Sequence, residues 1–320
     1  VADANGATSR EACIIKFDAT GNRLFASYYG GDQDDEFKGL DVNNNGEAIV
    51  VGFTDSDDIP LAGTPYQNAI SGDEDGIITL FAGNGALIYA SYFGGTEEDF
   101  LGGVYLDQDW LYFVGSTGSN GLSTAGAFQP ANAGRIDYIL GKFDITRGIN
   151  VGMNLDWATY FGGAEVDWME FRYTSFGRPI DVDKDDNLVF ALITDSDNLA
   201  TANGYMTSNP PDPGTGDRIR SIIAGKFDSN GNGMDRTYFR APDPSARGSA
   251  SVAATERGDI LIGGNFRTGH NYVFPAPSGG PDRTFGENYI IKFSANCEEL
   301  LCGRFNNFAL PAGVTRLDKD

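Results

Sequence analysis

An apolar strand, a polar turn and a second apolar strand that ends in threonine form the most regular pattern of this chain. It is clearest at residues 39–54, where Asn43 to Gly46 supply the turn, and it returns at residues 179–194. Looser copies occupy residues 104–117 and 251–266. Asparagine, aspartate and glycine tolerate the left-handed backbone angles of tight turns, so the pattern predicts β-hairpins.

A second apolar pattern, Ile-Ile-x-Phe and its close variants, recurs about every 65 residues. Its copies lie at residues 14–18, 77–81, 139–144, 222–228 and 290–294. One step is longer, and its extra residues (145–155 and the Pro/Gly-rich 209–214) are assigned to loops. Each repeat unit therefore adds two more strands around a turn such as Thr20-Gly21-Asn22.

A Tyr-x-Gly-Gly motif follows the first three copies, and an aspartate stands four residues after its last glycine. These aspartates are Asp35, Asp99 and Asp167. An aspartate at such a bend can accept backbone N–H bonds and fix the crossing between units, which we favour over ligand binding. Four-stranded antiparallel units in tandem are typical of propeller blades, whereas solenoid repeats are usually shorter. The expected fold class is all-β, a β-propeller of four-stranded antiparallel blades.

The combined pattern resembles the bacterial seven-bladed β-propeller (SBBP) repeat. The matching residues are Ile14 to Gly31, the turn that is Asp-x-x-Gly in the family and Asn43 to Gly46 here, the Val-x-Gly-x-Thr after it, and the late Pro65-Tyr66-Gln67 and Ala127-Phe128-Gln129. The resemblance is clearest over residues 11–205 and weakens after Phe239. It implies a bacterial protein that is secreted or attached to the cell surface. It also implies a repeat without established catalytic residues.

The repeat phase sets the expected boundaries within one domain, residues 1–320. We place an incomplete blade at 11–29, four blades at 37–94, 101–162, 178–240 and 249–305, and a tail at 306–320. About five blades are visible. Residues 313–320 resemble a further first strand. Either the N- and C-terminal strands close the ring, which would remove exposed edges, or the blades belong to a larger propeller.

Composition narrows the classes of partner. The formal net charge is −22 at pH 7, from 45 acidic and 23 basic residues. Such a surface repels nucleic acid and anionic lipid, so neither is expected as a partner. The acidic excess has two explanations: solubility in a salty or extracellular medium, and a face that meets cations or a basic partner. The chain has no apolar run of about 18 residues, which argues against a transmembrane segment.

The long connections are expected to gather on one side of the sheets. In a four-stranded blade, the loop between strands two and three and the connection to the next blade open on the same face, and here both are rich in acids. We expect this face to bind the partner or ligand. Its candidate binding residues are Asp35, Asp57, Asp58, Asp73, Asp75, Asp99, Asp167 and Asp195.

Three turns share the first half of an oxygen-rich Ca²⁺ loop. Their candidate ligands are Asp41, Asn43 and Asn45; Asp181, Asp183 and Asp185; and Asp228, Asn230 and Asn232. The acidic residue that such a loop needs at its twelfth position is missing in all three. Metal-free turns are therefore favoured, and no cofactor is expected; Ca²⁺ is the alternative.

The sequence contains no recognisable catalytic constellation. His270 is the only histidine, and we interpret it as a solvated loop residue rather than a catalytic base. Cys297 and Cys302 could form a disulfide in an oxidising compartment, which the sequence leaves open.

These features favour a non-catalytic, secreted or outer-surface bacterial module, with the periplasm as a further location. It would act as a scaffold or protein-interaction platform, within a larger protein or assembly. The alternative is a carbohydrate-binding propeller, or a carbohydrate-active lyase or hydrolase, with a glycan as its ligand.

Overall fold

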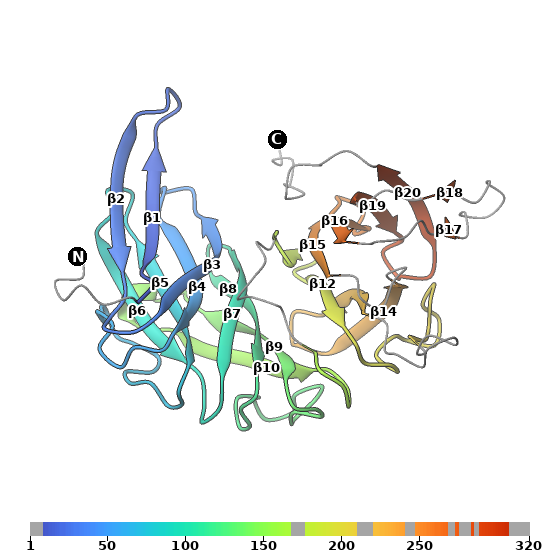
Figure 1. Cartoon of the computed structure of the whole chain (residues 1–320), viewed down its shortest axis with the longest axis horizontal. Helices are drawn as coiled ribbons and strands as arrows, with labels where there is room; N and C mark the ends of the chain where they lie inside the picture. The colour runs from blue at the N-terminus through green and yellow to red at the C-terminus, as the bar shows by residue number, and fades with distance from the viewer. Residues whose placement is uncertain are drawn as a thin grey trace. The chain divides into compact units, whose positions relative to one another are not determined.

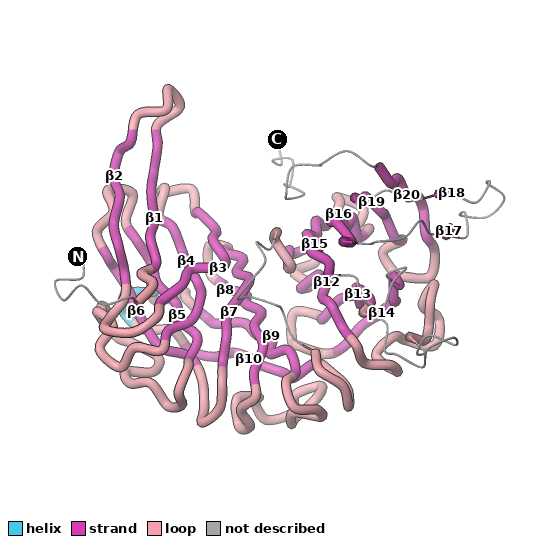
Figure 2. Tube along the Cα trace, in the orientation of Figure 1, coloured by secondary structure: helices cyan, strands magenta, loops and turns pink. Residues whose placement is uncertain are grey.

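The computed structural model describes residues 9–167, 177–209, 220–240, 247–267, 273–274, 283–284 and 288–306 (Figure 1). These residues form strands and loops, with one turn of 3-10 helix at Ile149–Val151 (Figure 2). In this part of the chain no helix is long and apolar enough to cross a membrane. Two compact units are distinguished: unit 1 holds residues 1–132 and 138–160, and unit 2 holds residues 133–137 and 161–320.

The strands form sheets in chain order. Sheet A contains β1 (Ala12–Phe17) and β2 (Arg23–Tyr29). Sheet B contains β3 (Asp35–Val42), β4 (Ala48–Thr54), β5 (Asp75–Phe81) and β6 (Leu87–Phe93). Sheet C contains β7 (Asp99–Leu106), β8 (Trp110–Thr117), β9 (Asp137–Asp144) and β10 (Asn154–Phe161).

Two further four-stranded sheets follow. Sheet D contains β11 (Ile180–Val182), β12 (Leu188–Thr194), β13 (Ser221–Phe227) and β14 (Gly233–Arg240). Sheet E contains β15 (Arg247–Ala254), β16 (Ile260–Arg267), β19 (Asn288–Phe293) and β20 (Leu300–Asn306). A short pair, β17 (Val273–Phe274) and β18 (Arg283–Thr284), lies between β16 and β19 in the chain.

The prediction of an all-β chain with four-stranded antiparallel sheets is confirmed. Each of the four complete repeat units forms one such sheet, and the N-terminal unit forms a two-stranded sheet in the described residues. Residues 307–320, which include most of the predicted tail, and His270 lie outside the described residues.

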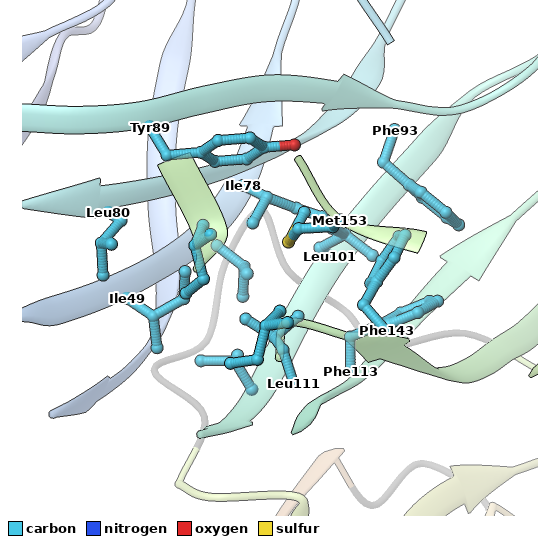
Figure 3. Close-up of a cluster of buried hydrophobic side chains, with 14 of the residues drawn as sticks. Ile49, Ile78, Leu80, Tyr89, Phe93, Leu101, Leu111, Phe113, Phe143 and Met153 are labelled. Carbon is cyan, nitrogen blue, oxygen red and sulfur yellow. The ribbon is translucent and has the colours of Figure 1, made fainter. Parts of the chain in front are cut away.

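Sheets B and C pack face to face around an aromatic cluster in unit 1 (Figure 3). Phe93, Phe113 and Phe143 are buried there, and the ring centroids of Phe93 and Phe113 lie 4.9 Å apart. Ile49 and Leu101 belong to the same cluster. Successive side chains of a strand point to opposite faces of its sheet. A strand with apolar residues on both faces can therefore pack against a neighbouring sheet on each side.

The phenylalanine that recurs in every repeat is a core residue in the complete sheets. Phe81, Phe143, Phe227 and Phe293 are at most 2% exposed. Phe17, the equivalent residue of sheet A, is 57% exposed. Burial of this residue therefore depends on a complete set of neighbouring sheets.

Candidate functional site

The strand register places the long loops of unit 1 at one edge of its sheets. Asp35 pairs with Thr54, and Thr54 pairs with Asp75, so the ends of these strands lie together. We call this the loop edge; it comprises residues 30–34, 55–74, 94–98 and 118–132. The opposite turn edge carries short turns such as 43–47 and 82–86. The loop-rich face therefore lies where the repeat pattern predicts it.

The recurrent aspartates fix the Gly-Gly bends at the loop edge. The backbone N–H of Gly31 donates a hydrogen bond to Asp35 Oδ2 at 2.8 Å. The equivalent bonds join Gly95 to Asp99 and Gly163 to Asp167, both at 2.6 Å. The structural role favoured from the sequence is thus observed, because each carboxylate satisfies a backbone donor at the bend.

A serine completes each of these sites, and the sequence analysis missed it. The hydroxyls of Ser56, Ser119 and Ser196 donate to the same aspartates at 3.1, 2.8 and 2.7 Å. Each serine oxygen also accepts the backbone N–H two residues after the Gly-Gly pair. The signal was present as a Thr-x-Ser sequence at the end of the second strand, residues 54–56, 117–119 and 194–196.

Burial raises the pKa of these carboxyl groups. Desolvation is the largest cause, and hydrogen bonds to the anion only partly offset it, so Asp35, Asp99 and Asp167 each reach a pKa of about 6. Repulsion from Asp75 adds to the effect at Asp99. A Cβ atom on Gly94 would lie 2.5 Å from Asp75 Oδ1 and 2.7 Å from Asp99 Oδ2, so any larger residue at this position would clash with both carboxyl groups.

The long loops also cover the outer edge of the last strand of each sheet. The backbone N–H of Tyr92 donates to the carbonyl of Gln67, and that of Tyr160 to Gln129, both at 3.1 Å. In unit 2 the N–H of Tyr238 donates to Met206 at 2.9 Å. These bonds occupy an edge that would otherwise be open to other strands.

Half of the predicted binding residues do not reach the surface, which corrects the sequence interpretation. Asp35, Asp75, Asp99 and Asp167 are at most 2% exposed. Asp75 accepts hydrogen bonds from Gln67 Nε2 at 2.7 Å and from the Ser71 N–H at 2.9 Å. These carboxylates hold the loops from beneath, because a bend with several free N–H groups needs an internal acceptor.

The other predicted binding residues remain accessible. Asp57, Asp58 and Asp73 are exposed at the loop edge of unit 1. In unit 2 Asp195 is half-buried, and Arg220 Nε lies 3.4 Å from its Oδ1. The loop that carries Asp73 lies against the loop of Glu97 and Glu98, since a Cβ atom on Gly72 would lie 2.8 Å from the carbonyl oxygen of Glu97. Glu97 and Glu98 are exposed as well.

The candidate Ca²⁺ ligands are engaged in turns and in contacts between sheets. Asn43, Asp183 and Asp228 each accept two backbone N–H bonds of their own turn through Oδ1. Asp41 and Asp181 accept the N–H of Leu106 and of Ala254 from the next sheet. The remaining candidates, Asn45, Asp185, Asn230 and Asn232, donate backbone N–H bonds or lie exposed in these turns. Among the described residues no group of three or more His, Cys, Asp or Glu is arranged to hold a metal ion.

The three cysteines are free thiols, so the disulfide left open between Cys297 and Cys302 is not formed. Cys297 is buried in a turn at a φ of 60°, with its Sγ 3.4 Å from the carbonyl oxygen of Asp235. Cys302 is exposed on β20. The two side chains therefore occupy different environments.

A cavity of about 810 Å³ opens between two long loops of unit 1. None of its lining side chains is charged. Its polar side chains are Tyr66, Gln67, Asn68, Ser71, Ser123 and Thr124, and its apolar ones are Pro65, Phe93, Leu122 and Leu155. The Tyr66 ring packs against Phe143, with centroids 5.1 Å apart. The cavity offers amide and hydroxyl groups beside an apolar wall.

Comparison with protein-family models gives no match, and comparison with curated proteins gives none either.

Proposed function

We propose that this chain is a β-propeller of SBBP-type repeats that acts as a non-catalytic, secreted or surface-exposed interaction module of a bacterium. In this proposal a basic protein partner docks on the loop edge. The repeated junction supports the propeller: one Gly-Gly, Asp and Ser arrangement links sheet A to sheet B and sheet B to sheet C. Propellers repeat one four-stranded blade in tandem, so the same crossing between successive sheets is expected.

The observation that supports the interaction surface is that the acids of the loop edge fall into two groups. The buried aspartates accept hydrogen bonds within the protein, whereas Asp57, Asp73, Glu97 and Glu98 are exposed on neighbouring loops. Arg10, a basic residue at this edge, is paired with Asp34 and Glu36. The exposed acids thus give the loop edge an excess of negative charge, which attracts a basic surface and speeds its encounter.

Neutralising two of these acids is expected to weaken binding of a lysine-rich peptide about three- to tenfold. The variant is Asp57→Asn with Asp73→Asn, and the matched control is Asp107→Asn with Asp109→Asn at the turn edge. Titration calorimetry at several salt concentrations measures both, and the wild-type affinity should fall as salt rises. Equal losses in the two double variants would show that only the total charge matters.

The 810 Å³ cavity favours a glycan as a second candidate ligand. Its uncharged amides and hydroxyls could hydrogen-bond sugar hydroxyls, and its concave, partly apolar wall suits a small ligand. A glycan array with the full chain is expected to give hits that Asn68→Ala weakens and Asn44→Ala, at the turn edge, leaves unchanged. An array without hits removes this candidate.

A further inference from the structure

Sheet A consists of two strands in the described residues, whereas sheets B to E each contain four. The shared motifs align β1 with β5 and β2 with β6, since Phe17 corresponds to Phe81 and Tyr28 to Tyr92. In sheet B the second edge of β5 pairs with β4 along its whole length. The same edge of β1 pairs with no strand in the described part of the chain. Figure 1 shows this hairpin at the border of unit 1.

A neighbouring face of sheet B is also uncovered. Leu40 of β3 is 55% exposed and Val42 is 50% exposed. Val104, which occupies the position of Leu40 in sheet C, is 2% exposed because β3 and β4 pack over β7. The repeat therefore shows what normally lies over this position: the first two strands of the preceding sheet.

The strand register shows which face of sheet B is left uncovered. Leu40 lies directly opposite Val50, and Val50 belongs to the buried cluster that includes Ile14 and Tyr29 of sheet A. Leu40 therefore faces sheet A, on the side where strands preceding β1 would lie. At the other end of β3, Phe37 is covered, because its ring stacks on Tyr29 with centroids 5.6 Å apart.

We propose that the open edge of β1 binds a two-stranded antiparallel segment of the same repeat type, the first two strands of one further repeat. The second strand of this segment pairs with β1, and the first lies over Leu40 and Val42. The unpaired backbone of β1 selects an extended strand, because N–H and C=O groups along an edge template β-strand addition. The exposed leucine and valine select apolar side chains on that strand pair. This surface is distinct from the loop edge.

The register of sheet B also fixes the expected contact. Val50 of β4 lies opposite Thr79 of β5, and Ile15 of β1 corresponds to Thr79. A bound segment with the sequence of residues 35–56 would place its Val50 beside Ile15. Ile15 is 50% exposed, so its replacement by cysteine should leave the fold intact.

Site-specific disulfide formation tests the proposal. The full chain carries Ile15→Cys in a background of Cys13→Ser and Cys302→Ser, and the probe is a synthetic peptide of residues 35–56 with Val50→Cys. After mild oxidation, mass spectrometry should find a cross-link about fivefold more abundant than with a Val51→Cys peptide, whose side chain points to the other face. Equal yields from the two peptides, or no cross-link at millimolar peptide, would overturn the proposal.

Three chain variants separate edge pairing from adhesion to apolar surface. Leu40→Asp in the same background is expected to reduce the cross-link yield about tenfold, since it puts a charge beneath the incoming strand. Phe128→Asp and Val151→Asp replace side chains that are 44% and 57% exposed outside sheet A and β3, and they should leave the yield within about twofold. A loss with Val151→Asp as large as with Leu40→Asp would show non-specific adhesion and overturn the proposal.

Discussion

Lowering the pH from 8 to 5 is expected to stabilise this protein. Burial raises the pKa of Asp99 and of Asp167 to about 6, whereas an unfolded aspartate titrates near 3.9. Between these values the folded chain holds protons that the unfolded chain releases. The free energy of unfolding therefore rises as the pH falls through 6 towards 4, by up to about 3 kcal/mol for each fully buried group.

Groups with the opposite shift set the acid limit. Hydrogen bonds lower the pKa of Asp18 to about 2, and the pKa of Asp183 is also lowered, by hydrogen bonds from Lys226 and Asn187 against desolvation. Their contribution is present above about pH 4 and is lost below it. The stability maximum is therefore expected near pH 4, which denaturant unfolding at a series of pH values would locate.

Asp99→Asn tests the origin of this pH dependence. The amide oxygen can still accept the Gly95 N–H, but the side chain no longer titrates, so the gain between pH 8 and pH 5 should shrink. Asp73→Asn makes the same change of charge at an exposed position and should preserve the wild-type slope. If both variants keep the wild-type slope, the buried carboxyl group is not responsible.

Phe113→Ala is expected to cost about 3–5 kcal/mol of unfolding free energy. Phe113 is fully buried between sheets B and C, and its ring lies 4.9 Å from that of Phe93 and 5.3 Å from that of Phe143, centroid to centroid (Figure 3). Truncation leaves a cavity that neighbours on three strands cannot fill without moving. Denaturant unfolding at constant pH measures the loss.

Phe128→Ala is the matched control. Phe128 is 44% exposed on a covering loop, so the same truncation removes far less buried surface and should cost about 1 kcal/mol. Similar losses in the two variants would contradict the packing of sheets B and C described above.

The sequence predicted the turns and bends because their chemistry is local. Asn43 and Asp228 bind the backbone of their own turns, and Asp35 binds a glycine four residues before it. Such contacts depend on a few consecutive residues and on the strand order, both of which the repeat reveals. The sequence did not predict the hydrogen bond between Asp99 and Ser119, because these residues stand 20 positions apart, one at the start of β7 and the other just after the end of β8.

The sequence also could not predict which acidic residues of the loops are buried. Asp73 and Asp75 stand two residues apart in one acidic run, yet Asp73 is exposed and Asp75 is buried. Only the three-dimensional path of the loop decides which carboxylate turns inward to meet backbone donors. Composition alone assigned both to a binding surface.

By itself, the sequence determined an all-β chain of repeated four-stranded units and the side on which their long loops lie, because strand alternation, turn residues and repeat length are properties of the chain. Only the tertiary structure decided which apolar and acidic residues are buried. Phe17 and Phe81 hold the same place in the repeat, but burial needs a second sheet against the face, and that depends on the neighbours the fold provides.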